Sequence, residues 1–328
     1  MSIVIGGQAI SDKLLLTGAN GFIGLHLSRE LSRLGLLARA AVRNSQNSLP
    51  EHVEVLKGCT LESDENWASA LTGVDCVLHC AARVHVMKET EPDPEQAFHR
   101  VNIEGTLRLA RFAAEAGVRR FVFLSSVKVL GEGTMTKDPY TEETVPAPEE
   151  AYGRSKLAAE QGLIALSEES GMEVVIVRCP LVYGPGVGGN FHSLMKLVDS
   201  PWPLPFGHID NARSLVFVGN LVDFLVHVID APKASGQTFL VSDGVDLSTT
   251  KLIELLRGAY GRPPRLFRFP WRWVMPIARL ARREAALERL LGSLQLDIGK
   301  ARDTLGWQPP FSVEQGIADT VKSCRLFR

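Results

Sequence analysis

Hydrophobic residues near the start of the chain change from a continuous run to a helical spacing. Residues 14–16 are three leucines, an apolar run of the kind that a buried parallel strand needs. After a short gap, apolar residues recur every three or four positions, which is the stripe of an amphipathic helix. The members of this stripe are Ile23, Leu27, Leu31 and Leu34. The pattern therefore predicts a strand, a turn and a helix in succession.

The same alternation continues to about residue 180. Strand-like runs lie at residues 36–42, 53–56, 74–80, 119–124 and 174–178, and helical patterns lie at residues 94–116 and 152–166. Strands that alternate with helices pack as a parallel sheet covered on both faces. We therefore expect an α/β fold, with a Rossmann-type doubly wound parallel sheet. The polar residues 131–150 form a loop long enough to cover a site.

Beyond residue 180 the alternation stops. Glycine- and proline-rich loops at residues 184–189 and 201–205 separate helical and strand-like pieces in irregular order. We expect an N-terminal extension at residues 1–12 and a dinucleotide-binding domain at residues 13–180. Residues 181–328 are then a smaller, mostly helical substrate lobe, with some segments returning to the sheet.

Composition places the chain among globular cytoplasmic proteins. Its 328 residues are 45% hydrophobic and 22% charged, and the net charge of −1 gives no general attraction to nucleic acid. No apolar run reaches the length of a membrane span, and the start lacks the pattern of a signal peptide. The five cysteines are odd in number and form no C-x-x-C pair, which predicts reduced thiols and no metal site.

Three glycines stand in the predicted turn at a spacing of three. Gly18 can take the tight turn, Gly21 lets the backbone approach a pyrophosphate, and Gly24 lets the helix pack closely on the strand. The free N–H groups and the positive dipole end of the helix then face the phosphates. The predicted dinucleotide contacts in this turn are Gly18, Asn20, Gly21, Phe22, Ile23 and Gly24.

The end of the second predicted strand bears on which dinucleotide is bound. NAD-preferring folds place an acidic residue there for the ribose 2′-hydroxyl. This chain has Arg43 instead, and an arginine can pair with the 2′-phosphate of NADP. NADP(H) is therefore favoured and NAD stays possible, with Arg39 as a second candidate for the phosphate contact. The alternative interpretation of Arg43 is a solvated residue in a basic loop.

Tyr152 and Lys156 lie one turn apart on the same face of a predicted helix. A tyrosine beside a fixed ammonium has a stabilised phenolate, so we expect the pKa of Tyr152 to fall from about 10 towards roughly 7 when Lys156 and a cationic nicotinamide are close. The tyrosine can then exchange a proton with a sugar hydroxyl or carbonyl while hydride moves to or from the nicotinamide. Ser126, at the end of the preceding strand, would bond the same oxygen.

Motifs along nearly the whole chain resemble those of a known family. They are T-G-x-x-G-x-x-G at residues 17–24, H-C-A-A at 79–82, N-I-E-G-T at 102–106, S-S at 125–126, Y-x-x-x-K at 152–156 and R-C-P-L-V-Y-G-P-G at 178–186. The sequence resembles an extended short-chain dehydrogenase/reductase of the nucleotide-sugar epimerase/dehydratase group.

This resemblance implies a catalytic triad of Ser126, Tyr152 and Lys156, with Asn102 ordering the site behind the tyrosine. Further cofactor contacts would come from Ala81, Ala82, Tyr152, Lys156, Pro180 and Val182. The substrate would be a UDP-sugar, and its contacts would be Arg83, His85, Ser125, Ser126, Lys128, Asn190 and Arg213. For two of these residues an interpretation without a substrate contact stays open, because His85 can be a loop histidine and Lys128 a solvated charge. The family also implies a homodimer.

The sequence departs from the family pattern in two places. The 4,6-dehydratases of the group follow the catalytic hydroxyl with Asp-Glu, whereas Val127 and Lys128 follow Ser126 here. Valine cannot carry a proton, which argues against dehydration. Thr60 stands where relatives usually have an aspartate for the adenine amino group, which weakens one adenine contact.

Three functions remain. The favoured one is NADPH-dependent reduction of the C4 ketone of a UDP-4-keto-6-deoxy-N-acetylhexosamine in surface polysaccharide synthesis. One reason is that Arg43 lacks an acidic partner. The other is that segments 81–87 and 124–129 resemble a bacterial subgroup that includes such reductases. The alternative is an NAD-dependent 4-epimerase of UDP-glucose or UDP-N-acetylglucosamine. A non-catalytic NAD(P)-sensing regulator is disfavoured, because such proteins typically lose the tyrosine or the lysine.

The basic and aromatic residues 265–276 fit two interpretations. They can rest on a membrane surface, where anionic lipids attract arginine and tryptophan prefers the interface. A substrate lid or a core segment is the favoured interpretation, so peripheral membrane contact is not expected.

Overall fold

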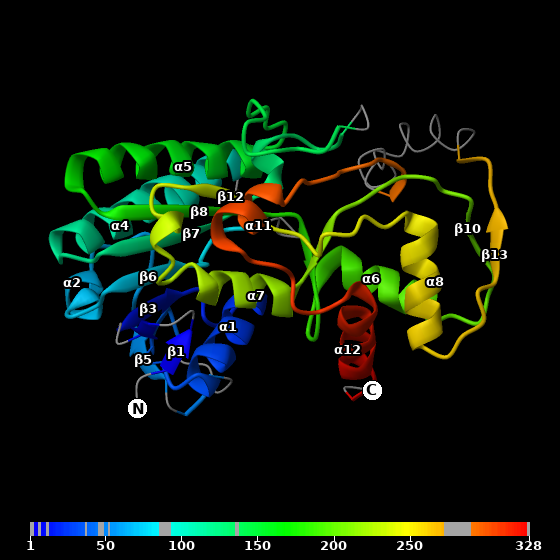
Figure 1. Ribbon diagram of the computed structural model, residues 1–328, viewed down its shortest axis with the longest axis horizontal. Coiled ribbons are helices and arrows are strands. Elements are labelled where there is room, and N and C mark those ends of the chain that lie inside the picture. Colours follow the sequence, from blue (N-terminus) through cyan, green and yellow to red (C-terminus); the bar gives the residue numbers. More distant parts are fainter. Residues whose placement is uncertain are drawn as a thin grey trace.

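The computed structural model describes residues 3–5, 8–10, 13–36, 38–44, 49–51, 53–84, 93–134, 138–271 and 290–326. Within these residues a seven-stranded, fully parallel sheet lies between two layers of helices in the left half of Figure 1. From one edge to the other its strands are β12 (Thr238–Leu240), β8 (Glu173–Cys179), β7 (Arg120–Ser126), β6 (Cys76–His79), β3 (Leu14–Thr17), β4 (Ala38–Val42) and β5 (Glu54–Lys57). The predicted α/β, doubly wound fold is confirmed.

The order of the strands reverses between β3 and β6. The chain first builds outward through β4 to β5, and then returns to the other side of β3 to add β6, β7 and β8. In such sheets ligands bind outside the carboxyl ends of the strands at this reversal. The predicted glycine turn follows β3, and the small residues Ala81 and Ala82 follow β6, so both lie at the reversal.

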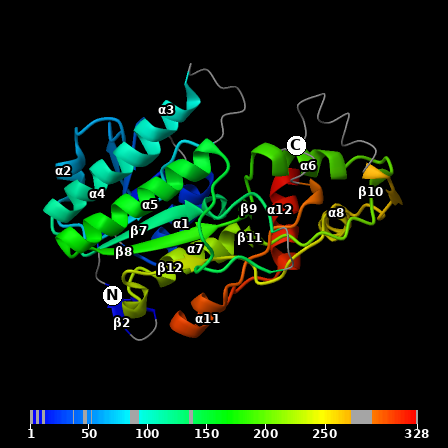
Figure 2. The same ribbon diagram turned by 90° about the horizontal axis from the view of Figure 1, so that it is seen from above.

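Helices cover both faces of the sheet (Figures 1 and 2). Leu14 and Leu16 pack in one cluster with α1 (Phe22–Arg33) and α7 (Val218–His227). Leu15 points to the opposite face, because successive side chains of a strand alternate, and joins the cluster of α2 (Trp67–Leu71), α4 (Gly105–Glu115) and α5 (Ala151–Ser170). A strand buried on both faces explains the uninterrupted run of leucines.

The helix predicted at residues 94–116 is divided into three segments. An α-helix, α3 (Pro94–Phe98), leads into a π-helix, η1 (His99–Glu104), which leads into α4. The π-helical turns contain Asn102, which is 1% exposed and faces the neighbouring α5. Insertions of this kind are frequent at functional sites.

The C-terminal half contributes to the sheet and also forms a separate lobe. Strand β12 pairs with β8, and α7 packs beside α1. The remaining described elements are β9 (Leu181–Tyr183) paired with β11 (Leu215–Phe217), β10 (Leu204–Gly207) paired with β13 (Leu266–Arg268), α6 (Gly189–Val198), η3 (Pro232–Ala234), α8 (Thr249–Ala259), α11 (Gly299–Leu305) and α12 (Val313–Leu326). At the other terminus, β1 (Ile3–Ile5) and β2 (Gln8–Ile10) form an antiparallel hairpin. The division at residue 180 stays a prediction.

The described part of the basic and aromatic stretch includes a packed tryptophan. Trp271 stacks on Phe206 with ring centroids 5.4 Å apart, and its Nε1 donates to the carbonyl of Pro205 at 2.9 Å. Residues 272–276 lie outside the described residues. Across the part of the chain that the structure describes, no helix has the length and apolar character to cross a membrane.

Candidate active site

The glycine turn brings the ends of β3 and β6 together. Gly18 has a φ of +71°, a conformation that L side chains rarely adopt, and a Cβ on it would lie 2.7 Å from the Ala81 nitrogen. A Cβ on Gly24 would lie 2.1 Å from the Gly18 oxygen. Glycine at these two positions therefore lets α1 begin directly against the end of the strands.

The turn fits a dinucleotide diphosphate. Helix α1 starts after Gly21, and no side chain caps its N-terminus, so its first N–H groups are open to an anion. The Asn20 Oδ1 atom is buried and has no hydrogen-bond partner among the described residues, although the Nδ2 atom lies 3.5 Å from the Asn44 carbonyl. A buried acceptor without a partner is costly in the protein alone and suits a donor from a ligand.

The two arginines of β4 and its following turn lie in different surroundings. Arg43 is exposed just beyond the carboxyl end of the strand. Arg39 is near the amino end, where its guanidinium pairs with Glu54 at 2.7 Å and donates to the Ala70 and Thr72 carbonyls. In the parallel register Arg39 is paired with Leu15, two residues before the end of β3. Its role as a second phosphate contact stays a prediction.

Lys156 is buried in the first half of α5 with little to balance its charge. Its side chain is 2% exposed, and Nζ donates to the Leu124 carbonyl at 2.7 Å and lies 4.1 Å from the centroid of the Phe123 ring. Burial lowers the pKa of Lys156 to about 8. The residue is therefore an ammonium held near the carboxyl end of β7, one turn from Tyr152.

Tyr152 differs from the sequence-based expectation in its titration. Burial raises the pKa of its phenol above the usual range, and hydrogen bonding with Ser126 lowers it by less. The expected fall towards neutrality is thus not present in the protein alone, because the loss of solvent outweighs the neighbours. The phenol is protonated at neutral pH and is in place to donate a proton.

The two adjacent serines at the end of β7 have different partners. The Ser126 Oγ accepts a hydrogen bond from the Lys128 backbone at 3.3 Å and interacts with the Tyr152 phenol. The Ser125 hydroxyl donates to Glu160, a carboxylate that is itself paired with Arg178 at 2.6 Å. The Ser125 hydroxyl is therefore engaged with a buried carboxylate of α5, and its role as a substrate contact stays a prediction.

Asn102 connects the end of β6 to the tyrosine helix. Its Oδ1 accepts from the Arg83 backbone at 2.8 Å, and its Nδ2 donates to the Arg83 carbonyl and to the Ser155 Oγ, both at 3.0 Å. Ser155 in turn donates to the Tyr152 carbonyl at 2.8 Å. The π-helical segment thus places one amide where it orders the loop after β6 and the backbone that holds the phenol.

The other predicted contacts are more dispersed. Pro180 is buried, Val182 is half-buried in β9, and Asn190 is exposed in the first turn of α6. The Arg213 guanidinium donates to the Gly292 carbonyl at 2.9 Å. The guanidinium of Arg83 lies 5.9 Å from the Phe98 ring centroid, Lys128 is paired with two glutamates, and His85 lies outside the described residues.

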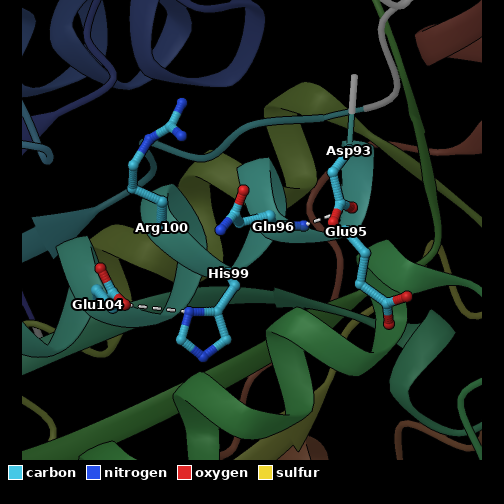
Figure 3. A pocket seen from close by; sticks show the side chains of 6 residues that line it. All are labelled: Asp93, Glu95, Gln96, His99, Arg100 and Glu104. Carbon is cyan, nitrogen blue, oxygen red and sulfur yellow. Dashed lines mark hydrogen bonds and ion pairs between the residues drawn. The ribbon is translucent and has the colours of Figure 1, made fainter. Parts of the chain in front are cut away.

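A charged pocket along α3 and η1 contains none of these predicted residues (Figure 3). It encloses about 610 Å³ and is lined by Asp93, Glu95, Gln96, His99, Arg100 and Glu104. His99 and Glu104 pair across it at 3.2 Å. The pocket is lined by charged and polar side chains, and Ser126, Tyr152 and Lys156 are not among them. It is therefore separate from the candidate site.

Sequence reasoning missed two buried polar groups that hold the site together. His79 lies between the hydroxyls of Thr17 (2.7 Å) and Thr106 (3.0 Å), and burial lowers its pKa to about 3, so it is neutral. Glu160 and Arg178 form the second group, and their partner Ser125 belongs to the same strand end as Ser126. The sequence signals were the motifs that contain His79 and Thr106, and a charged residue, Arg178, inside an otherwise apolar strand.

This fold, with a glycine turn at the strand reversal and a tyrosine and lysine one turn apart beside a serine, is that of the short-chain dehydrogenase/reductase class. The family model described as "NAD dependent epimerase/dehydratase family" matches residues 14–242. The chain belongs to the NAD-dependent epimerase/dehydratase family and is an enzyme of nucleotide-sugar chemistry.

Named relatives agree with this membership. The chain is 41% identical over 326 residues to a UDP-glucose 4-epimerase of Vibrio cholerae, covering 97% of both chains, and 30% identical over 332 residues to one of Mycolicibacterium smegmatis, covering 95% of this chain and 98% of the relative. Among solved structures, a UDP-glucose 4-epimerase of Thermotoga maritima with UDP-glucose has a TM-score of 0.78 at 23% identity, covering 96% of this chain and 99% of that one. This structural likeness supports the fold.

Proposed function

We propose that this chain is a UDP-hexose 4-epimerase that works with a bound NAD. The observation that carries the proposal is its 41% identity, along 97% of both chains, to a protein named UDP-glucose 4-epimerase. This similarity favours the epimerase over the reductase that the sequence analysis preferred. The placement of Ser126, Tyr152 and Lys156 at the carboxyl ends of the strands supports the same chemistry.

In the proposed reaction the protein handles the proton at the sugar 4-oxygen. Tyr152 takes this proton in the oxidising half and returns it in the reducing half, while Ser126 hydrogen-bonds to the same oxygen. A dinucleotide held at the glycine turn before α1 would supply the hydride chemistry at C4. Because the Tyr152 phenol is protonated in the protein alone, the oxidising half needs a cation near it, and Lys156 on the same helix face is the candidate.

Two features argue against water elimination at this site. Val127 follows Ser126 and is buried, so the residue next to the serine in the sequence has no carboxyl group to act as acid or base. The next residue, Lys128, is paired with Glu132 and Glu150.

The substrate itself is proposed to be a UDP-sugar, with Arg213 and Asn190 as the candidate phosphate contacts. The expected assembly is a homodimer.

A second candidate function is reduction of a UDP-4-keto sugar by NADPH. The observation that favours it is Arg43, which is exposed at the end of β4 where an acidic residue would bind the 2′-hydroxyl of NAD. In this alternative Tyr152 only donates its proton, and the cofactor leaves after each turnover.

A paired assay separates the two functions. The purified chain is given UDP-glucose with NAD, and separately UDP-4-keto-6-deoxy-N-acetylglucosamine with NADPH. We expect UDP-galactose to form in the first assay with no net change in nicotinamide absorbance. Stoichiometric loss of NADPH in the second assay, with no interconversion in the first, would establish the reductase and overturn the epimerase.

A further inference from the structure

Lys128 touches both sides of the joint between the serine strand and the tyrosine helix. It lies in a short 3-10 turn, η2 (Val127–Val129), directly after Ser126. Its backbone N–H donates to the Ser126 Oγ at 3.3 Å. Its carbonyl oxygen lies against α5 so closely that a Cβ on Gly153 would be 2.5 Å away. The main chain of this one residue therefore contacts the serine on one side and the residue after Tyr152 on the other.

The side chain of Lys128 makes a further link to the same helix. Its ammonium lies 3.1 Å from both carboxylate oxygens of Glu132 and is also paired with Glu150. Glu150 is the N-cap residue of α5, directly before the helix and two positions before Tyr152. All three side chains are about three-quarters buried, so water and salt screen the attraction less than at an open surface.

We propose that Lys128 is a positioning residue that fixes the first turn of α5, and with it the Tyr152 phenol, against Ser126. This inference rests on the proposed roles of Tyr152 and Ser126. The ammonium has three donors and here serves two carboxylates, one on the loop after η2 and one at the start of α5. Without it, Glu132 and Glu150 would face each other as like charges, and the helix start would move away from the turn.

A structural explanation for Gly153 follows from the same arrangement. The helix approaches η2 so closely that no side chain fits between them, because a Cβ on Gly153 would lie 2.5 Å from the Lys128 carbonyl oxygen and 3.1 Å from the Pro148 Cβ. Gly153 on α5 and Lys128 on η2 thus both determine how close the first turn of α5 lies to η2. A change at either residue should separate Tyr152 from Ser126 without removing a reacting group.

The test is steady-state kinetics of matched variants in the assay where the wild type is active. Lys128→Met is expected to lower kcat by about 10- to 100-fold with KM within about twofold, because a displacement of the order of 1 Å at a catalytic group has this effect. Lys128→Arg is expected to recover most of the loss. Glu150→Gln is expected to lower kcat more than Glu132→Gln, although both remove one negative charge, because only Glu150 is the N-cap residue of α5.

Gly153→Ala provides a second route to the same joint and leaves the charges intact. We expect it to lower kcat like Lys128→Met, so the proposal can be decided even where Lys128→Met does not fold. Cofactor binding, followed by fluorescence, should be unchanged in all soluble variants. The proposal is overturned if Lys128→Met or Gly153→Ala keeps wild-type kcat, or if the loss at Lys128 is a rise in KM alone, which would indicate direct sugar binding.

A Tyr152→Phe variant in the same series distinguishes this failure from failure of the proposed function. If Tyr152→Phe is inactive while Lys128→Met and Gly153→Ala are normal, the tyrosine chemistry stands and the positioning role does not. If Tyr152→Phe is fully active, the proposed chemistry itself is wrong.

Discussion

The Lys156 side chain combines a positive charge with nearly complete burial. Its described partners are one backbone carbonyl and the face of the Phe123 ring. Removing an ammonium from water costs free energy that these partners only partly offset, which is why the pKa of Lys156 is lowered from 10.5 to about 8. We interpret this burial as a charge that lowers the free energy of unfolding and is kept because it serves the function.

The sign of the effect gives a testable pH dependence. Below about pH 8 the lysine is protonated in both the folded and unfolded states, and the cost is fully present. Between about pH 8 and 10.5 the unfolded chain binds more protons, so the lysine's contribution makes stability rise with pH. Lys156→Met should therefore raise the free energy of unfolding at pH 7 by about 3 kcal/mol, and this gain should shrink towards pH 10.5.

Urea unfolding of the wild type and Lys156→Met at several pH values measures this difference, and activity is measured in parallel. Turnover of the variant should fall by at least about 100-fold while its stability rises. A variant that is less stable than the wild type at pH 7 would contradict the buried-charge account.

At the scale of single residues, the sequence predicts which residue types form the site better than it predicts which partners their side chains contact. The spacing of Tyr152 and Lys156 was sufficient to place both on one helix face. The Ser125 hydroxyl donates to Glu160, a partner that the sequence pattern does not show, so the role of Ser125 as a substrate contact stays a prediction. The raised pKa of Tyr152 could not be predicted from the sequence either, because the burial of the phenol depends on residues that are distant in the chain.

Among the elements, α1 and the turn before it depend most on one close contact. The carbonyl of Gly18 lies where a side chain on Gly24 would begin, so the helix can start against β3 only with glycine there. By contrast, a Cβ on Gly258, inside α8, would meet no atom within 4 Å. The two helical glycines form a matched pair for substitution.

Gly24→Ala should push α1 away from the turn and weaken dinucleotide binding by at least about tenfold, with a lower melting temperature. Gly258→Ala should be neutral or stabilising by up to about 1 kcal/mol, because alanine is the better helix former. Fluorescence titration with NADH and thermal unfolding measure the two effects. Unchanged NADH binding by Gly24→Ala would contradict the assignment of this turn to the cofactor.

The predicted elements were most accurate where the hydrophobic pattern was local. The strand, turn and helix at the start appear as β3 and α1, and the helix predicted at residues 152–166 appears within α5. The π-helix η1 was not predicted, because widening a helix by one residue per turn barely changes the spacing of apolar positions. Strand β12 was not placed either, because three residues carry little signal and its partner β8 is distant in sequence.

In the whole molecule, the segments before and after residue 180 share one hydrophobic cluster. This cluster joins leucines of β3 and α1 to Trp307 and Val313 near the C-terminus. A buried polar network adds to it, since Asp243 accepts hydrogen bonds from the Phe217 backbone at 2.7 Å and from the Asn220 and Tyr183 side chains at 2.8 Å. Such long-range contacts cannot be read from sequence patterns, whereas the glycine turn and the tyrosine helix can.

Conversion of UDP-glucose to UDP-galactose by the wild type and by Tyr152→Phe, both loaded with NAD, tests the central claim. We predict that the wild type interconverts the two sugars without net change in nicotinamide absorbance. The variant should bind NAD equally well and be at least about 100-fold slower, because it lacks the proton that moves at the 4-oxygen. Equal rates for the two proteins would contradict the proposed role of Tyr152, and an inert wild type would contradict the epimerase.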